Sequence, residues 1–157
     1  MVSFGSSSSG PQFWIASDRL NDRKVAFYSN FLLKETAVSH LVSIQAQVRD
    51  PAAVIAACTR LKLSAPINCT VRLFSAQETG LAVQLPGWKY PVVCQTESGE
   101  LKYDDFGGRW GDRGELDRFL QAYAVEKAKI EARRQGHSVT EQQLADGSIR
   151  VQIAVAG

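Results

Sequence analysis

The stretch Tyr103–Arg113 (YDDFGGRWGDR) gathers more potentially reactive side chains than any other part of the sequence. It contains three carboxylates, two guanidiniums, three aromatic rings and three glycines. Glycines allow the backbone to turn tightly and to approach a ligand closely. Arg109 and Arg113 could hold a phosphate or a carboxylate as planar forks, and the free N–H groups of a following helix would strengthen anion binding. The composition is therefore typical of a binding loop.

A structural turn is the alternative interpretation of this stretch. The aromatic rings would then anchor the turn, the carboxylates would bond its backbone and the arginines would pair with the carboxylates. Asp105-Phe106-Gly107 spells the magnesium-binding triplet of kinases, but the chain is too short for a kinase and lacks the partner motifs. Gly107–Gly111 is no phosphate loop, because no Gly-Lys-Ser/Thr follows it. Both interpretations stay open.

A second loop, Leu85–Pro91 (LPGWKYP), adds two aromatic residues that are expected near the first loop. Exposed aromatic side chains commonly anchor protein partners, whereas buried ones seal the edge of a core. The candidate binding surface therefore consists of Trp88, Tyr90, Asp104, Asp105, Phe106, Arg109, Trp110 and Arg113. No residue is assigned a catalytic role. An enzyme or small-ligand site would use Asp104, Asp105, Arg109 and Asp112.

Histidine and cysteine spacing predicts neither a metal site nor a cofactor. His40 and His137 are the only histidines, and no Cys-x-x-Cys pair occurs. Cys58, Cys69 and Cys94 stand alone in apolar or strand-like surroundings, where a thiol acts as a small core hydrophobe. Unpaired cysteines indicate a reducing compartment, and no apolar run approaches the length of a membrane span. We expect a soluble cytoplasmic protein without a membrane partner.

Charge argues against a dedicated nucleic-acid binder. The 18 Lys and Arg residues exceed the 16 Asp and Glu residues by only +2. The basic side chains near the end of the second predicted helix alternate with Glu126 and Glu131, at spacings suited to ion pairs. They are Lys127, Lys129, Arg133 and Arg134. An internally paired face is the favoured interpretation, and weak nucleic-acid binding is an alternative.

Periodicity predicts an α+β fold in the order β-α-β-β-β-β-α-β-β from residue 42 onward. Residues 42–48 alternate as a strand, Asp50 and Pro51 begin a helix, and short strands follow near 70–75, 81–85, 91–96 and 100–103. A second helix is expected over 114–135, and a closing hairpin turns at Asp146-Gly147. We expect a two-layer arrangement, with both helices on one face of an antiparallel sheet of six to seven strands.

Residues 1–37 differ from the rest of the chain. Ser6–Pro11 is of low complexity, and the apolar residues that follow it have no sustained period. We interpret 1–37 as a low-order extension or a mis-assigned start, with translation beginning at Val38, and 38–157 as a single α+β domain.

Three stretches resemble one family. They are Ser39–Ile44, Leu85–Val92 and Tyr103–Gly111, and the resemblance extends over about Val38–Val155. The family is a group of small proteins of unknown function that includes a hypothetical chloroplast reading-frame protein of cyanobacteria and algal plastids. Its members typically begin with Met-Ser-His, close to Val38-Ser39-His40 here. The resemblance implies association with an ATPase of the AAA+ type and provides no catalytic residue.

These observations favour a non-enzymatic binding or adaptor domain with a protein partner. The resemblance makes an AAA+ ATPase one candidate for that partner.

A shortened chain that starts at Val38 is expected to fold with a nearly unchanged free energy of unfolding, because residues 1–37 lack core periodicity. Urea unfolding of the full and shortened chains measures the difference. A loss above about 2 kcal/mol exceeds ordinary surface effects and would mean that the segment is packed.

Overall fold

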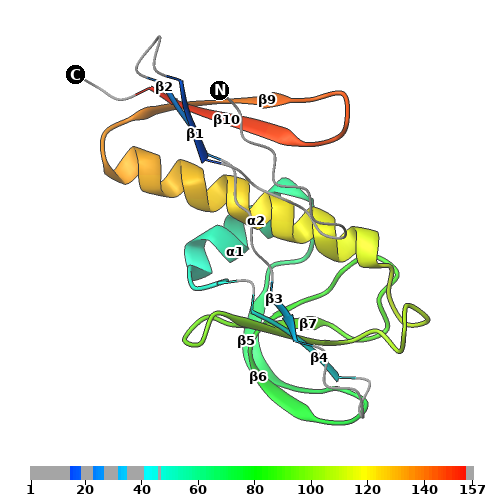
Figure 1. The fold of residues 1–157 in the computed structure, drawn as a ribbon. Coiled ribbons are helices and arrows are strands. Elements are labelled where there is room, and N and C mark those ends of the chain that lie inside the picture. Colours follow the sequence, from blue (N-terminus) through cyan, green and yellow to red (C-terminus); the bar gives the residue numbers. More distant parts are fainter. Residues whose placement is uncertain (1–14, 19–22, 27–31, 35–40, 46, 155–157) are drawn as a thin grey trace. The chain divides into compact units, whose positions relative to one another are not determined.

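The computed structural model describes residues 15–18, 23–26, 32–34, 41–45 and 47–154 (Figure 1). It contains two helices, α1 (Pro51–Arg60) and α2 (Arg113–Arg134). Four short strands come first: β1 (Ile15–Asp18), β2 (Arg23–Ala26), β3 (Leu32–Lys34) and β4 (Leu41–Gln45). The later strands are β5 (Ile67–Arg72), β6 (Gln77–Val83), β7 (Val92–Gln95), β8 (Glu100–Asp104), β9 (Ser138–Gln143) and β10 (Ile149–Ala154).

The α+β class and the order of elements from β4 to β10 agree with the sequence-based expectation. The expected single sheet of six to seven strands differs from the structure, in which the described strands form two antiparallel sheets. One sheet has the order β3-β4-β8-β7-β6-β5, and the other has the order β1-β2-β10-β9. The closing hairpin pairs with β2 and not with the meander. Period-2 alternation identifies a strand but not its neighbour, which explains the difference.

The chain divides into two compact units. One contains Phe31–Tyr123, and the other combines Met1–Asn30 with Ala124–Gly157. Helix α2 begins in the first unit and ends in the second. Neither described helix combines the length and the apolarity needed to cross a membrane.

Three strands lie within the segment 1–37. The backbone of β2 pairs with β1 and β10, and that of β3 pairs with β4. Ser6–Pro11 and Val38–His40 lie outside the described residues. The interpretation of 1–37 as an extension and of 38–157 as one domain therefore stays a prediction, and the chain shortened to Val38 remains its test.

Helix α1 begins as its sequence predicts. The side chain of Asp50 accepts hydrogen bonds from the backbone N–H groups of Ala52 and Ala53, and Pro51 occupies the first helical position. Val54 and Cys58 are fully buried. Burial raises the pKa of the Cys58 thiol to about 11. Burial, with a smaller contribution from Cys58, also raises the pKa of the Cys94 thiol on β7. Both thiols are therefore core hydrophobes, as expected.

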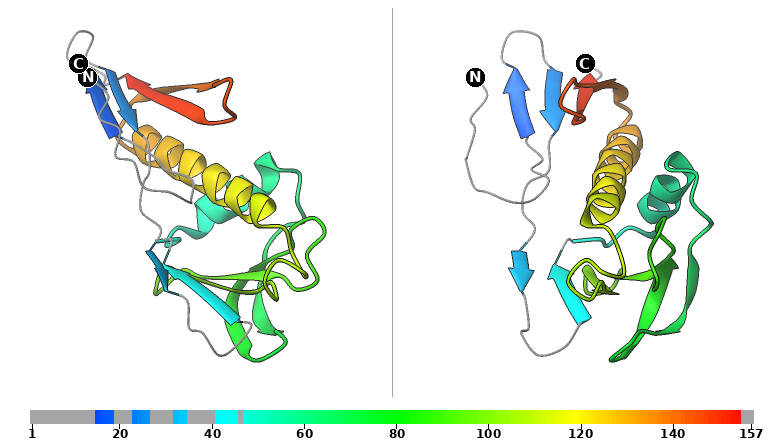
Figure 2. Two further views of the ribbon diagram at one scale, coloured as in Figure 1. Left: turned by 45° about the vertical axis from the view of Figure 1, so that its right-hand side comes forward. Right: turned by 90° about the vertical axis from the view of Figure 1, so that its right-hand side faces the viewer.

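The first half of α2 lies beside the six-stranded sheet (Figure 2). The sheet, the segments directly after β5 and β6, and this half of α2 contribute the largest buried side chains of the first unit. These are Tyr103, Phe119, Leu73, Leu85, Leu101, Leu116 and Leu120. In the second unit, Val151 of β10 forms a small core with Val125 and Ala128 of α2. Val139, Ile149 and Ile153 pack against that core, so the predicted alternation of the last strand is confirmed over its described residues.

The hydroxyl of Tyr123 organises the connection between β4 and α1. It accepts hydrogen bonds from the backbone N–H groups of Arg49 (3.1 Å) and Asp50 (3.2 Å) and donates to the carbonyl of Gln47 (3.3 Å). Gln47 has a φ of 53°, a left-handed conformation that is uncommon for a side-chain-bearing residue. One buried oxygen therefore satisfies several backbone groups of an irregular connection.

Replacing Tyr123 by Phe is expected to lower the free energy of unfolding by about 1–3 kcal/mol, because buried backbone N–H groups lose their acceptor. Urea unfolding measures the change. Tyr90→Phe, a change in a partly exposed loop tyrosine of the same unit, is the matched control and should stay within about 0.5 kcal/mol of the parent. Equal effects of the two variants would contradict this role of Tyr123.

Candidate functional site

Trp88 is a buried anchor between the two candidate loops. Its side chain is 5% exposed, and its ring meets that of Tyr103 edge-on at 5.5 Å between centroids. The indole N–H donates to the carbonyl of Asp112 at 3.1 Å. A Cβ built on Gly111 would overlap the indole, so only glycine fits there. Trp88 therefore holds the β8–α2 loop and is not available as an exposed partner anchor.

The β8–α2 loop has an unusual backbone. Phe106, Gly107 and Gly108 adopt positive φ angles of 47°, 64° and 87° in succession. The carboxylate of Asp105 accepts a hydrogen bond from the N–H of Gly107 (3.1 Å), and its carbonyl accepts one from Trp110 (2.9 Å). These bonds match the structural interpretation of the loop, in which carboxylates bond its backbone. The loop is therefore closed on itself, and this conformation fixes where Phe106 and Trp110 lie.

Trp110 is the centre of an aromatic cluster. Phe106 stacks on it at 4.6 Å between ring centroids, with 26° between the planes. Tyr90 meets it edge-on at 5.5 Å, and Phe74 lies tilted at 5.0 Å. These rings come from the hairpin loop between β5 and β6, the β6–β7 loop and the β8–α2 loop. Three segments that are distant in the sequence thus converge on one indole.

Two cations lie over these rings. The ammonium nitrogen of Lys89 is 4.4 Å from the ring centroid of Trp110 and 5.4 Å from that of Tyr90. The guanidinium carbon of Arg109 is 5.2 Å from the ring centroid of Phe106. Such cation–π contacts stabilise by about 0.5–1 kcal/mol at exposed positions. We call the set Phe74, Lys89, Tyr90, Phe106, Arg109 and Trp110 the Trp110 cluster.

The Trp110 cluster lies at the protein surface. Phe74 is 59% exposed, which is unusual for so large an apolar side chain. Lys89 and Arg109 are also exposed, and Tyr90, Phe106 and Trp110 are half-buried. Rings that are fixed by one another and still face solvent offer a rigid, partly apolar patch bordered by positive charge.

Three other residues of the candidate surface lie apart from this patch. Asp104 is fully buried, and Trp88 is nearly so. Arg113 donates a hydrogen bond to the hydroxyl of Tyr103 (2.8 Å) and pairs with Asp117 at 3.3 Å within α2. These contacts stabilise the start of the helix. The surface placement of Trp88 and Asp104 was therefore wrong, because spacing along the chain does not reveal which side of a loop faces inward, whereas the side chain of Arg113 is 38% exposed.

Phe74 and Lys89 belong to the cluster but were missed as site residues. Phe74 follows β5 in a short turn that carries no recognisable motif. Lys89 stands between two aromatic residues that were selected, and its alternation with them is the one signal that could have identified it.

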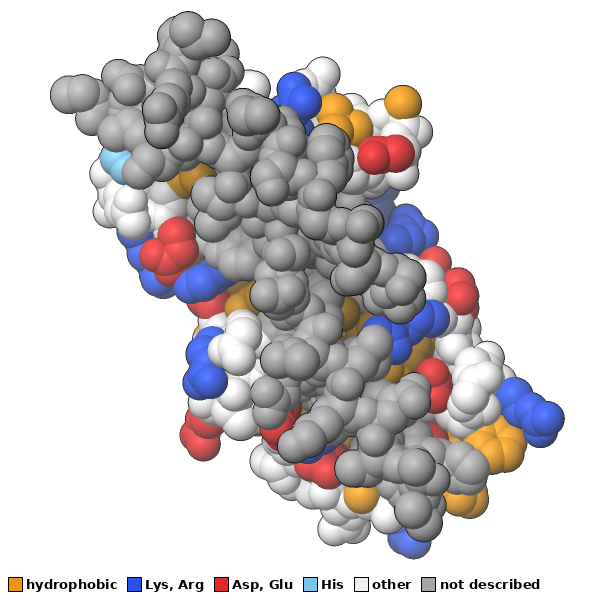
Figure 3. Space-filling view, viewed as in Figure 1, with side chains coloured by type: hydrophobic (Ala, Val, Ile, Leu, Met, Phe, Trp, Pro, Cys, Tyr) orange, Lys and Arg blue, Asp and Glu red, His pale blue; other side chains and the backbone are white. Residues whose placement is uncertain are grey.

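Three of the four basic side chains near the end of α2 pair with glutamates of the same helix, as the favoured interpretation expects. Lys127 and Arg134 pair with Glu131 at 2.6 and 3.1 Å, and Lys129 pairs with Glu126 at 3.1 Å. On the face drawn in Figure 3, positive and negative side chains are interspersed among the described residues. Among those residues, no group of three His, Cys, Asp or Glu side chains could hold a metal ion.

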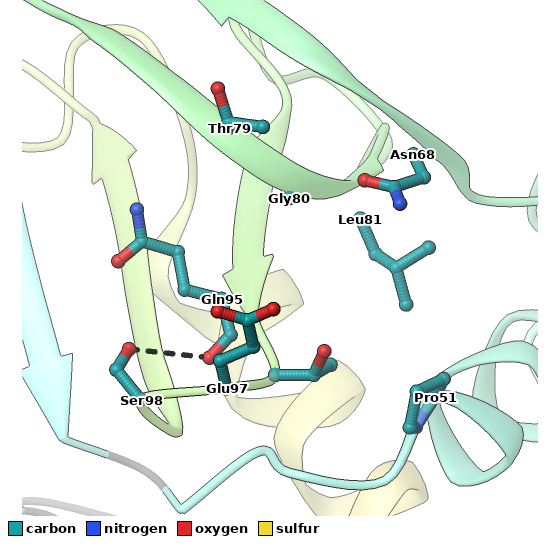
Figure 4. Close-up of a pocket in the computed structure, with 9 residues that line it drawn as sticks. Pro51, Asn68, Thr79, Gly80, Leu81, Gln95, Glu97 and Ser98 are labelled. Carbon is teal, nitrogen blue, oxygen red and sulfur yellow. Dashed lines mark hydrogen bonds between the residues drawn. The ribbon is translucent and has the colours of Figure 1, made fainter.

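A hollow of about 530 Å³ lies at another place in the first unit, between the beginning of α1 and the sheet (Figure 4). Pro51 borders it on the helix side, Asn68 and Leu81 come from β5 and β6, and Glu97 and Ser98 come from the β7–β8 turn. The lining is rich in amides and hydroxyls and includes one carboxylate. The sequence analysis did not identify this hollow, because its residues come from separate elements and form no motif.

Comparison of the chain with protein-family models, curated proteins and solved structures gives no match. The family resemblance of the three sequence stretches is thus untested by these comparisons and stays a prediction.

Gly111→Ala is expected to lower the free energy of unfolding by about 1–3 kcal/mol, because the new methyl group would overlap the buried Trp88 ring. Thermal or urea unfolding measures the loss. Gly114→Ala is the matched control. Its methyl group would meet the side chain of Asp112, and alanine favours the first turn of α2. If Gly111→Ala unfolds no more easily than Gly114→Ala, Trp88 does not fix this loop.

Proposed function

We propose that this chain is a non-enzymatic binding domain that recognises a protein partner through the Trp110 cluster. The observation that supports the proposal is the convergence of Phe74, Phe106 and Tyr90 on one indole at the surface, with Phe74 59% exposed. Aromatic residues and arginine dominate the binding energy of protein interfaces, and they cluster where water is excluded. Both kinds of residue are present here.

The way in which the cluster is held also favours recognition. The N–H of Lys89 donates to the carbonyl of Trp110 at 2.8 Å, which joins the β6–β7 loop to the β8–α2 loop. Trp88 and Gly111 lock the same two loops from the inside. A surface whose side chains are already fixed loses little conformational entropy on binding. The Trp110 cluster is therefore organised before a partner arrives.

The family resemblance adds a candidate for the partner. If it holds, the partner is an ATPase of the AAA+ type, and the domain is an accessory protein to that ATPase in the cytoplasm. Lys89 and Arg109 favour an acidic patch on such a partner, because opposite charges speed association and fix orientation.

Two alternatives have less support. A catalytic or small-ligand site in the Tyr103–Arg113 loop would use Asp104, Asp105 and Asp112, but Asp104 is fully buried, and Asp105 and Asp112 bond the backbone N–H groups of Gly107 (3.1 Å) and Gly114 (3.2 Å). Nucleic-acid binding through the end of α2 would have to compete with the ion pairs of Lys127, Lys129 and Arg134.

The test is a charge reversal on the cluster. Arg109→Glu combined with Lys89→Glu should reduce capture of the partner by roughly thirtyfold, since about 2 kcal/mol is typical of one interface hot spot. The protein is immobilised, captured proteins are quantified by mass spectrometry, and the leading one is purified for an affinity measurement. Trp110→Ala should reduce the same affinity, provided that circular dichroism and a cooperative melt show that it is folded.

The matched control is Arg118→Glu, which reverses an exposed charge on α2 outside the cluster. It should capture the partner as the parent does. If the double variant stays folded and binds the purified partner with parental affinity, the Trp110 cluster is not the recognition surface.

A further inference from the structure

Strand β5 ends the six-stranded sheet on one side. Among the described strands its one neighbour is β6, with which it pairs continuously from Ile67 opposite Ala82 to Arg72 opposite Gln77. Its outer side therefore presents a row of backbone N–H and C=O groups that are not used in this sheet. The figures draw no described strand beyond it (Figures 1 and 2).

This edge has little of the protection that natural sheet edges usually carry. Charged side chains, above all lysine, proline, bulges and very short strands are the common protective features. Within Ile67–Arg72 the one charged side chain is Arg72 at the end of the strand, there is no proline or lysine, the pairing with β6 has no bulge, and the strand is six residues long. Its first side chain, Ile67, is 66% exposed. A regular edge that no described strand covers, with an exposed aliphatic residue, is a template for another strand.

The two faces of β5 differ in chemistry. Asn68, Thr70 and Arg72 are exposed and polar, whereas Cys69 and Val71 on the other face are half-buried. Side chains of neighbouring strands meet those of the same face. A strand that pairs with β5 would therefore be apolar on one face and polar on the other.

The charged residues on and near β5 indicate which charge a strand paired with β5 would carry. Residues 60–77 contain Arg60, Lys62 and Arg72 but no Asp or Glu, and the next acidic residue, Glu78 of β6, is half-buried and accepts a hydrogen bond from the side chain of Gln95. Phe74, two residues beyond β5, leads directly to the Trp110 cluster with its own cations, Lys89 and Arg109. Positive charge thus occurs before, on and after the edge, which favours an acidic segment and disfavours a basic one.

We propose that β5 takes an extended, acidic peptide segment of the protein partner as an additional strand, with apolar and acidic residues alternating along it. The end of that segment then reaches Phe74 and the Trp110 cluster. The backbone bonds along β5 supply affinity, and the alternation supplies register and specificity. The inference rests on the proposed function, because it identifies the kind of segment that the cluster receives.

The experiment uses the full chain and three labelled synthetic peptides. They are Glu-Val-Glu-Val-Glu-Val, its rearrangement Glu-Glu-Glu-Val-Val-Val, and Lys-Val-Lys-Val-Lys-Val. We expect the alternating acidic peptide to bind about tenfold more tightly than either control by fluorescence anisotropy. Hydrogen exchange should then slow at outward-facing amides within Ile67–Arg72. Arg72→Glu should weaken acidic-peptide binding about tenfold, and Arg118→Glu should not.

Equal binding of the alternating and rearranged acidic peptides, or unchanged exchange along β5, would overturn the proposal. A dimer detected by light scattering would also overturn it, if dimer formation slows hydrogen exchange at the same amides. The occupant of the edge would then be a second copy of this chain. Failure of the proposed function has a different signature. In that case the double variant Arg109→Glu with Lys89→Glu binds the purified partner with the affinity of the parent protein. The alternating peptide still slows hydrogen exchange of the β5 amides.

Discussion

The packing of the Trp88 indole against Gly111 is the contact on which the candidate surface depends. The ring lies so close to the backbone of Gly111 that no side chain fits between them, and its N–H bonds the carbonyl just before α2. One buried residue thereby fixes the β6–β7 loop and the β8–α2 loop up to the residue that precedes the helix. The exposed Trp110 cluster is organised because the layer directly beneath it cannot rearrange without opening the core.

Candidate binding residues and core residues are neighbours along the chain in this region. Trp88 and Trp110 both belong to aromatic loops, but the first is a core side chain and the second is the centre of a surface cluster. Asp104 and Asp105 are adjacent, yet one is fully buried and the other bonds the backbone of the turn. The carboxylates and glycines of this loop make a structural turn, and the aromatic and basic side chains on that turn remain the candidate binding residues.

The strand edge and the cluster form a continuous candidate surface in the first unit. β5 runs into the hairpin loop that carries Phe74, and Phe74 packs on Trp110. Backbone pairing and side-chain recognition have complementary roles in such a surface. Backbone pairing along a strand edge is nearly independent of the partner's sequence. Discrimination between partners would therefore depend on the charged and aromatic side chains of the Trp110 cluster at the end of the edge.

Local sequence was sufficient for the elements from β4 to β10, but not for β1, β2 and β3. Asp50-Pro51 marked the beginning of α1, and Asp146-Gly147 marked the last hairpin. Local sequence could do this because capping and turn conformation depend on near neighbours. Only the tertiary structure decided that the last hairpin pairs with β2, that Trp88 is buried and that Phe74 joins Trp110. These outcomes depend on which strands pair and on which side of a loop faces the core. Both are set by packing between residues that are distant in the sequence, and such packing leaves no periodic signal in the sequence.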